Sequence, residues 1–251
     1  MDNKQIINSQ FISLLMCVEL SRAIPTGCKT IDKLLGGGLP PETLSLVYGE
    51  AETGKTTLAM QCAVNCAKQG HKTLFVDCDG SFSPERLSQV ASGDFDKVAE
   101  MIILIKPTSF REQAAFVDQI DDYVTANVAL VVFDTVTSLY RVRVAESPSG
   151  TFKLNRELNR QLAVLAQTTR TRKITILMTS QVHAVFDEMP IDSEPVATRV
   201  LKFWADTIIA MKPTETPQNI RMVLEKGPNK TQPVNCNARI QETGIHDLAP
   251  R

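Results

Sequence analysis

The 251-residue sequence lacks several features that mark specialised classes of protein. No apolar run reaches the roughly 18 residues needed to span a membrane, and no segment has the pattern of a cleavable secretion signal. The chain contains no internal repeat and no low-complexity linker. Because 43% of its residues are hydrophobic, disorder and fibrous structure are excluded. We therefore expect a cytoplasmic protein that makes no contact with a membrane.

The six cysteines form no C-x-x-C pair, and their spacing to histidines is not that of a zinc site. Only Cys62 and Cys66 lie close together in the sequence, and both fall on a predicted helix. We interpret the cysteines as small, buried apolar residues in a reducing compartment. This composition excludes a miniprotein that depends on disulfide bonds.

An excess of charge of one sign is also absent. The 27 Lys and Arg residues are balanced by 28 Asp and Glu, which gives a formal net charge of -1. This balance argues against a strongly basic nucleic-acid protein, but an average conceals local segregation. Residues 141–173 contain eight basic and two acidic residues, so this segment alone has a net charge of +6.

From residue 23 onward, short apolar runs alternate with longer helical patterns. This alternation predicts an α/β fold with a mostly parallel central sheet that is flanked by helices. Residues 1–22 lie outside the pattern, and we predict an N-terminal extension there, with native translation starting at Met16 as a hypothesis; residues 23–251 form the predicted core. Strands are expected at 44–47, 73–76, 101–105, 128–133, 174–178, 206–211, 220–224 and 238–240, and helices at 55–68, from 84, at 110–124 and at 154–169.

One motif joins the predicted strand at 44–47 to the helix that follows. It reads G-x-x-x-x-G-K-[ST] from Gly49 to Thr56, which is the pattern of a phosphate-binding loop. Successive backbone N–H groups and the positive end of the helix dipole would point at one bound phosphate. We expect Lys55 to contact the β- and γ-phosphates and the Thr56 hydroxyl to bind Mg²⁺. The predicted nucleotide contacts are Gly49, Glu50, Ala51, Glu52, Thr53, Gly54, Lys55, Thr56 and Thr57.

An acidic residue ends the most apolar predicted strand. Residues 128–133 are six apolar residues in succession, which is typical of a strand buried on both faces, and Asp134 follows them. Asp134 would then lie at the carboxyl edge of the sheet, where ligands bind in open α/β folds. We predict that Thr56 and Asp134 hold Mg²⁺, with Asp134 acting through its water shell. The alternative is that Asp134 only caps the next segment.

Further segments resemble the RecA/RadA recombinase superfamily, and within it the archaeal RadB family, over roughly residues 25–248. The segment V-D-C-D-G-S-F-S-P-E-R-L at 76–87 is similar to the D-T-E-G-x-x-x-P-E-R-L segment of that superfamily. The resemblance implies a RecA-like P-loop NTPase core, ATP and Mg²⁺ as cofactors, and a role in DNA repair and homologous recombination. The other similar segments are P-T-G-C-K-T-I-D-K-L-L-G-G-G-L at 25–39, V-V-F-D-T-V-T-S-L-Y-R at 131–141, M-T-S-Q-V at 178–182 and L-K-F-W-A-D at 201–206.

The resemblance implies roles for single residues. Asp79 matches the catalytic Glu that orients or deprotonates the attacking water. Gln181 matches the residue that senses the γ-phosphate, and Arg86 matches the Arg that lies over the adenine ring. Each of these residues also has a simpler interpretation, as a turn residue, a strand-end amide and a solvated helix charge respectively.

Two positions depart from the superfamily. Asp79 is one methylene shorter than Glu, and a misplacement of about 1 Å costs on the order of 10²-fold in rate, so we predict slow ATP hydrolysis. Trp204 stands where strand-exchange recombinases usually have His, which predicts weak coupling between nucleotide and DNA.

The resemblance places the first DNA-binding loop at residues 142–151, within the basic segment. Leucines at every third or fourth position from 154 to 165 form a stripe that should face the sheet, so Arg156 and Arg160 face outward. A second loop at 183–198 holds four acidic residues and no Lys or Arg, which argues against strand exchange. The alternative for the basic segment is a solvated helix face, and the predicted phosphate contacts are Arg141, Arg143, Lys153, Arg156 and Arg160.

We therefore predict an ATP-binding accessory protein that binds single-stranded or branched DNA and modulates the main recombinase. The resemblance implies very weak ATPase activity, no strand exchange, and RadA-type recombinases or junction-processing enzymes as partners, with a homo-oligomer as a further option. Two alternatives stay open. One is a filament-forming strand-exchange recombinase, and the other is a KaiC-like regulatory ATPase that acts through protein contacts only.

Overall fold

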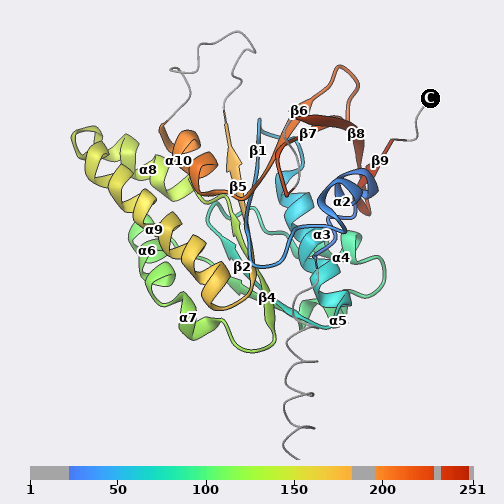
Figure 1. The fold of residues 1–251 in the computed structure, drawn as a ribbon, viewed down its shortest axis with the longest axis horizontal. Helices are drawn as coiled ribbons and strands as arrows, with labels where there is room; N and C mark the ends of the chain where they lie inside the picture. The colour runs from blue at the N-terminus through green and yellow to red at the C-terminus, as the bar shows by residue number, and fades with distance from the viewer. Residues whose placement is uncertain (1–22, 183–195, 229–232, 249–251) are drawn as a thin grey trace, which may run out of the picture.

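The predicted alternation of strands and helices folds around one nine-stranded sheet in the computed structural model, which describes residues 23–182, 196–228 and 233–248 (Figure 1). The strand order is β3-β2-β4-β5-β1-β6-β7-β8-β9. The strands from β3 to β6 in this order are parallel neighbours, whereas β6 to β9 pair antiparallel. The bounds are β1 Leu44–Gly49, β2 Lys72–Asp77, β3 Ile102–Ile105, β4 Val128–Asp134, β5 Thr175–Gln181, β6 Thr207–Pro213, β7 Asn219–Lys226, β8 Val234–Gln241 and β9 Gly244–Asp247.

Helices cover both faces of this sheet, so the predicted α/β class with a mostly parallel sheet is confirmed (Figure 1). Side chains of β2 alternate between the two resulting cores: Phe75 packs on one face, and Leu74 and Val76 pack on the other. One face carries α2 (Lys29–Leu35), α3 (Lys55–Lys68), α4 (Pro84–Ala91) and α5 (Phe95–Ala99). The other carries α6 (Phe110–Asp118), α7 (Ile120–Tyr123), α8 (Ser138–Glu146), α9 (Thr151–Thr171) and α10 (Val196–Trp204).

The strand β4 is the most deeply buried element of the sheet. Every residue from Val128 to Asp134 is buried, as the uninterrupted apolar run predicts. The prediction of buried, unpaired cysteines is also confirmed for four of them, since Cys28, Cys62, Cys66 and Cys78 are free and buried, while Cys236 is free and half-buried. Burial raises the pKa of the Cys66 thiol to about 11. None of the described helices is both long and apolar enough to cross a membrane.

The segment expected to be a loop at 142–151 is mostly helical, so that prediction is wrong. Helix α8 continues to Glu146, a 3₁₀ turn spans Pro148–Gly150, and α9 begins at Thr151. The sequence pattern misses α8 because Tyr140 is the only buried residue on it, and so no apolar stripe marks it. A second difference concerns residues 110–124, which form two helices, α6 and α7, that are joined at Gln119.

A hairpin of β8 and β9 closes the sheet near the end of the chain, and its last strand is not predicted by the sequence pattern. The buried side chain of Gln61 on α3 ties this hairpin to the helix. Its Nε2 donates to the carbonyl of Ile245 over 3.1 Å, and its Oε1 accepts from the Ile245 N–H over 2.7 Å. A Cβ placed on Gly27 or Gly244 would lie within 2.5 Å of the Gln61 amide. The amide is therefore enclosed by backbone on both sides.

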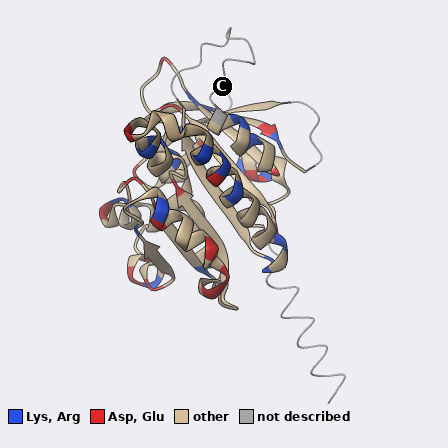
Figure 2. Ribbon diagram, turned by 90° about the vertical axis from the view of Figure 1, so that its left-hand side faces the viewer, with Lys and Arg blue, Asp and Glu red and all other residues tan. Residues whose placement is uncertain are grey.

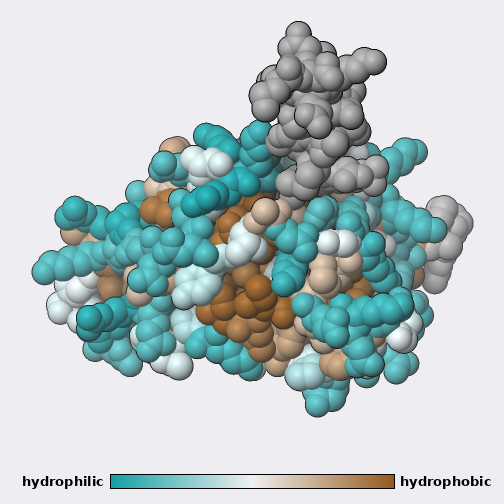
Figure 3. Space-filling model, turned by 90° about the horizontal axis from the view of Figure 1, so that it is seen from below, coloured by the Kyte–Doolittle hydropathy of each residue, from teal (hydrophilic) through white to brown (hydrophobic). Residues whose placement is uncertain are grey.

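Some apolar groups stay at the surface. On β3, an edge strand of the sheet, Ile103 and Leu104 are 40% and 39% exposed. Seen from below, the molecule has an apolar area at the centre of its surface, within a hydrophilic rim (Figure 3). Along its outer side, an edge strand also has N–H and C=O groups that form no hydrogen bonds to a neighbouring strand.

We predict that Gln61→Leu destabilises the protein. The substitution leaves the N–H and C=O of Ile245 buried without partners, and each such group costs about 1–3 kcal/mol. The free energy of unfolding, measured with urea, should therefore fall by about 2–6 kcal/mol. Gln167→Leu, which changes an exposed glutamine of α9, is the matched control and should stay within about 0.5 kcal/mol of the parent. Equal effects of the two substitutions would contradict the role assigned to Gln61.

Candidate functional site

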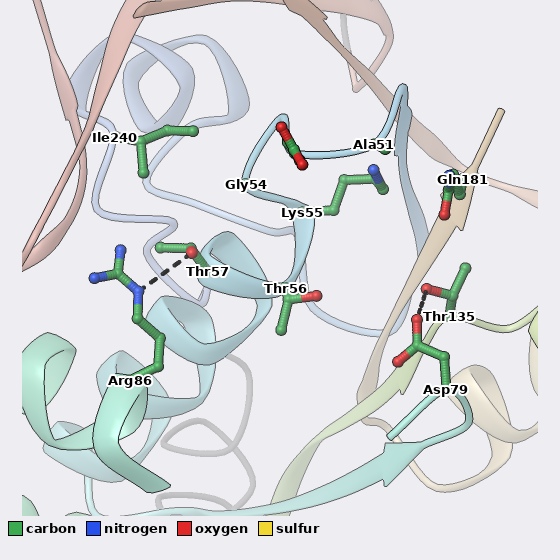
Figure 4. Close-up of a pocket in the computed structure, with 11 residues that line it drawn as sticks. Ala51, Gly54, Lys55, Thr56, Thr57, Asp79, Arg86, Thr135, Gln181 and Ile240 are labelled. Atoms are coloured by element: carbon green, nitrogen blue, oxygen red, sulfur yellow. Dashed lines mark hydrogen bonds between the residues drawn. The ribbon is translucent and has the colours of Figure 1, made fainter. Parts of the chain in front are cut away.

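A cavity of about 400 Å³ opens at the carboxyl edge of the parallel strands, around the start of α3 (Figure 4). Ligand sites in open α/β sheets lie at this edge. The structure thus brings together residues that are far apart in the sequence. The cavity is lined by Ala51, Glu52, Gly54, Lys55, Thr56, Thr57, Asp79, Arg86, Thr135, Gln181 and Ile240.

Both positions in the motif need glycine, because other backbone or side-chain atoms lie where a Cβ atom would be. A Cβ on Gly49 would lie 2.0 Å from the carbonyl oxygen of Met211 on the neighbouring strand. Gly54 has a φ of +86°, and a Cβ there would lie 2.9 Å from a methyl carbon of Ile240. The loop between them enters α3 directly at Lys55. Its backbone N–H groups and the N-terminus of a 14-residue helix are therefore available to an anion.

Lys55 is buried at the base of the cavity, with an exposed fraction of 8%. Its ammonium group donates to the carbonyl of Glu50 and lies 3.5 Å from Oγ1 of Thr53. Burial lowers the pKa of Lys55, whereas the carboxylates of Asp134 and Asp79 act in the opposite direction. Residues Gly49, Glu50 and Thr53 shape the loop without lining the cavity.

Three oxygen-bearing side chains meet beside Lys55. Asp134 is fully buried at the end of β4, where it accepts hydrogen bonds from Thr179 and, over 3.3 Å, from Oγ of Ser81. The Ser81 hydroxyl is in turn 3.5 Å from Oγ1 of Thr56. Burial raises the pKa of the Asp134 carboxyl, so a nearby cation would favour its ionised form. Hydroxyl and carboxylate oxygens suit Mg²⁺, which needs few protein ligands when phosphate oxygens and waters complete its shell.

Asp79 lies across the cavity from Lys55 and is held in place by its neighbours (Figure 4). Its Oδ2 accepts from Oγ1 of Thr135 over 2.9 Å, and its Oδ1 accepts from the N–H of Ser81 over 3.1 Å. The loop that carries it is fixed by Asp77, which accepts from the N–H groups of Ser81 and Phe82. The carboxylate of Asp79 is thus oriented by two donors.

Arg86 extends from α4 to the opposite end of the cavity. Its guanidinium donates to the carbonyls of Gln241 and Glu242, each over 2.8 Å, and lies 3.4 Å from Oγ1 of Thr57. The tip of the β8–β9 hairpin is therefore tied to this side of the cavity. Gln181 is at the end of β5, and its side chain points into the cavity near Lys55 (Figure 4).

Three residues of the site are not found from the sequence. Thr135 directly follows Asp134, and Ser81 comes two residues after Asp79. Their hydroxyl groups were the signal that the sequence offered. Ile240 carries no such signal, because it is one apolar residue in a strand far from the phosphate loop in the sequence. Only the folded hairpin brings it within reach of Gly54.

The basic residues of the segment 141–173 differ in their surroundings, since acidic residues of α6 and α7 form ion pairs with Arg160 and Arg172. Figure 2 marks the basic residues in blue and the acidic residues in red. Arg160 binds the carboxylates of Asp118 and Glu157, and Arg172 lies 3.1 Å from Asp121. The hydrogen bonds from Arg160 lower the pKa of the Glu157 carboxyl.

The start of α9 keeps its positive charge. Lys153 and Arg156 have no ion pair within residues 23–182, 196–228 and 233–248. On α8, Arg143 pairs with Glu146 over 3.1 Å, and Arg141 has a partner of its own. Within α9, the basic residues without an ion pair among the described residues thus lie in the first two turns.

Trp204 ends α10 and does not line the cavity. Its indole Nε1 donates to Oδ1 of Asn159 on α9 over 2.9 Å. The acidic residues of the predicted second loop, Asp187, Glu188, Asp192 and Glu194, lie outside the described residues.

A phosphate loop between a parallel strand and a helix, with a buried carboxylate at the end of β4 and the strand β5 lying between β4 and β1, defines a RecA-like P-loop protein. The comparisons with known proteins agree. A family model described as Rad51 matches residues 20–248. The chain therefore belongs to the Rad51 family, and the resemblance to RadB proteins is confirmed by the relatives described next.

Two relatives are named "DNA repair and recombination protein RadB". The one from Thermococcus onnurineus is 35% identical over 231 residues, which cover 91% of this chain and 99% of the relative. The one from Thermococcus kodakarensis is 36% identical over 228 residues, which cover 90% and 99%. A solved structure titled "Crystal structure of the RadB recombinase" has 34% identity and a TM-score of 0.76, and the match covers 90% of this chain and 100% of that one.

We predict that Ser81→Ala weakens the effect of Mg²⁺ on nucleotide binding. The hydroxyl bridges Thr56 and Asp134, so its loss removes an oxygen from the site that would hold the ion. In a titration of Mg²⁺ monitored with a fluorescent ATP analogue, the half-saturating concentration should rise about 3- to 10-fold, which corresponds to the net free energy of one hydrogen bond, about 0.5–1.5 kcal/mol. Ser88→Ala, an exposed serine on α4, is the matched control. Unchanged Mg²⁺ dependence in the Ser81 variant would show that the hydroxyl does not take part.

Proposed function

We propose that this protein is an ATP-binding accessory factor of DNA repair and homologous recombination. It binds DNA and modulates the main recombinase, with very weak ATPase activity and no strand exchange of its own. Its partners on this proposal are a RadA-type recombinase or junction-processing enzymes. Membership of the Rad51 family and the names of the RadB relatives support the involvement in recombination.

The observation that carries the proposal is the short carboxylate at the hydrolytic position. Asp79 is fixed by Thr135 and the Ser81 N–H, so its carboxylate has little freedom to move toward the phosphate. A general base that is one methylene short leaves the attacking water poorly oriented. The site would then hold ATP for long periods, and the ATP-bound protein itself would be the signal.

Different residues of the cavity would bind different parts of the nucleotide. The loop N–H groups and Lys55 would bind the phosphates, Arg86 and Ile240 would face the base, and Gln181 would lie near the γ-phosphate. Thr56, Ser81 and Asp134 would hold Mg²⁺, which supplies charge neutralisation at the β- and γ-phosphate oxygens. Apart from this, the residues of the site would bind the nucleotide and orient it.

DNA binding is proposed for the basic segment at 141–173, with the main phosphate contacts at Lys153 and Arg156 and further contacts at Arg141, Arg143 and Arg160. The first two are favoured because no carboxylate among the described residues neutralises them. Arg160 is the weakest candidate, since two carboxylates hold it already.

We predict that Asp79→Glu raises ATP turnover. The longer side chain moves the carboxylate outward by about 1.5 Å, the length of one C–C bond, and a better-placed base should increase kcat by about 10-fold or more. Phosphate release at saturating ATP is the measurement. Asp79→Asn keeps the size of the side chain without a base and should fall below the parent. If Asp79→Glu bound ATP normally and hydrolysed it no faster than the parent, the position would not limit turnover.

We predict that Arg156→Glu weakens binding to single-stranded DNA and flattens its salt dependence. Loss of one phosphate contact should reduce the slope of log K against log salt by about 0.7. Fluorescence anisotropy at several salt concentrations measures both quantities. Lys97→Glu makes the same change in net charge on α5, where the lysine is 88% exposed, and should leave both values near those of the parent.

The same measurements separate the two alternatives. A KaiC-like ATPase that acts through protein contacts only would show no DNA binding even at low salt. A strand-exchange recombinase would form joint molecules from a single strand and a homologous duplex. Robust joint-molecule formation would therefore overturn the accessory role.

A further inference from the structure

Two cysteines that are far apart in the sequence meet where α2 lies beside the β8–β9 hairpin (Figure 1). Cys28 comes directly before α2 and is fully buried, whereas Cys236 on β8 is half-buried. Both side chains pack into the same apolar core on one face of the sheet. Neither of them lines the cavity described above, so the nucleotide site does not account for them.

Asp247 on β9 holds Cys28 against the hairpin. Its carboxylate accepts from the first two backbone N–H groups of α2, over 2.6 and 2.9 Å, and from Sγ of Cys28 over 3.4 Å. In the sheet, Asp247 is the register partner of Ala238 on β8. Cys236 precedes Ala238 by two residues, so their side chains lie on the same face of the strand. This arrangement brings Cys236 to the thiol of Cys28.

The two thiol groups interact with each other. Their interaction lowers the pKa of Cys236 and raises the pKa of Cys28, so Cys236 is the first of the two to ionise. Its partial exposure also gives Cys236 contact with solvent. An accessible thiolate beside a second thiol is the arrangement found in cysteines that react with oxidants and then form a disulfide.

Three other cysteines of the described chain are less suited to this reaction. Cys62, Cys66 and Cys78 are buried, and burial raises the pKa of each thiol. The protonated thiol is a much poorer nucleophile than the thiolate. Among the described cysteines, we therefore expect Cys236 to react first with an oxidant.

We propose that Cys28 and Cys236 form a peroxide-sensitive pair that closes into a disulfide bond. The Cys236 thiolate attacks one oxygen of hydrogen peroxide and the O–O bond breaks, which leaves a sulfenic acid on Cys236 and a hydroxide that takes up a proton to form water. The Cys28 sulfur then attacks the Cys236 sulfur, the S–O bond breaks, and the hydroxyl group leaves as water with the thiol proton of Cys28. The two thiols are oxidised by two electrons in total, and the peroxide is reduced.

The disulfide would tie β8 covalently to the residue that precedes α2. Ile240, which lines the cavity, comes four residues after Cys236 and so lies on the same face of β8. A covalent bond at Cys236 would limit movement of this wall, and oxidation should therefore slow the release of bound nucleotide. This consequence rests on the nucleotide binding proposed above, whereas formation of the disulfide does not.

The first experiment treats the full chain with hydrogen peroxide and measures its intact mass, followed by mapping of linked peptides. We expect the mass to fall by that of two hydrogen atoms, with Cys28 joined to Cys236. Cys236→Ser should form no such link. In Cys28→Ser, which keeps a donor for Asp247, Cys236 should instead be trapped as sulfenic acid by dimedone. Cys17→Ser, which changes a cysteine outside the described residues, is the matched control and should oxidise like the parent.

A reduced mass without a link between Cys28 and Cys236, or no loss of mass at all, would overturn the proposal. Trapping of sulfenic acid on Cys28 in the Cys236→Ser variant would overturn the assigned order of the two steps. The peptide map of the parent decides the matter even if Cys28→Ser does not fold, because it needs no substitution.

The second experiment measures release of a fluorescent ATP analogue from the reduced and the oxidised parent, with excess unlabelled ATP. We expect release from the oxidised form to be about 3-fold slower or more, with the original rate restored by dithiothreitol and no effect of peroxide on Cys236→Ser. Equal rates would overturn the effect on the cavity. Absence of nucleotide binding by the reduced parent would overturn the proposed function and this effect with it, whereas the disulfide is judged by the mass and the peptide map alone.

Discussion

The complete burial of β4 is the constraint on which the candidate site depends. A strand enclosed on both faces delivers the carboxylate of Asp134 into a region that water hardly reaches, where an unpaired charge is costly. The fold meets this cost with hydroxyl groups from Thr179 and Ser81 and with the ammonium of Lys55 nearby. One electrostatic arrangement therefore includes the phosphate loop, Asp134 at the end of β4 and the loop that carries Ser81.

The second organising feature is the attachment of the β8–β9 hairpin. Gln61 anchors it to the middle of α3, and Arg86 binds the carbonyls at its tip. Ile240 is thereby placed against Gly54 and lines the cavity. The end of the cavity near Arg86 is thus built by polar contacts to backbone groups, whereas the end near Lys55 is built by the loop itself.

Much of the parallel half of the fold could be predicted from the sequence, because β1, β2, β4 and β5 are continuous apolar runs and the phosphate-loop motif fixes the connection from β1 to α3. The sequence also indicated the segments that carry Asp79, Asp134 and Gln181. Elements without an apolar stripe were missed. Helix α8 buries one residue only, and β9 is four residues long, so neither leaves a periodic signal. Pairings such as Arg160 with Asp118 join positions 42 residues apart, and no local pattern encodes them.

Because the β8–β9 hairpin follows the phosphate loop in the sequence, the two sides of the cavity form at different times during synthesis. The phosphate loop is synthesised long before Ile240 and Ile245, so a chain emerging from the ribosome has the phosphate-loop side of the cavity without its opposite wall. Domains begin to fold from the N-terminal side during synthesis, but this cavity is complete only when the final antiparallel strands dock. On the proposed function, retention of nucleotide would therefore distinguish a molecule with the docked hairpin from a nascent one.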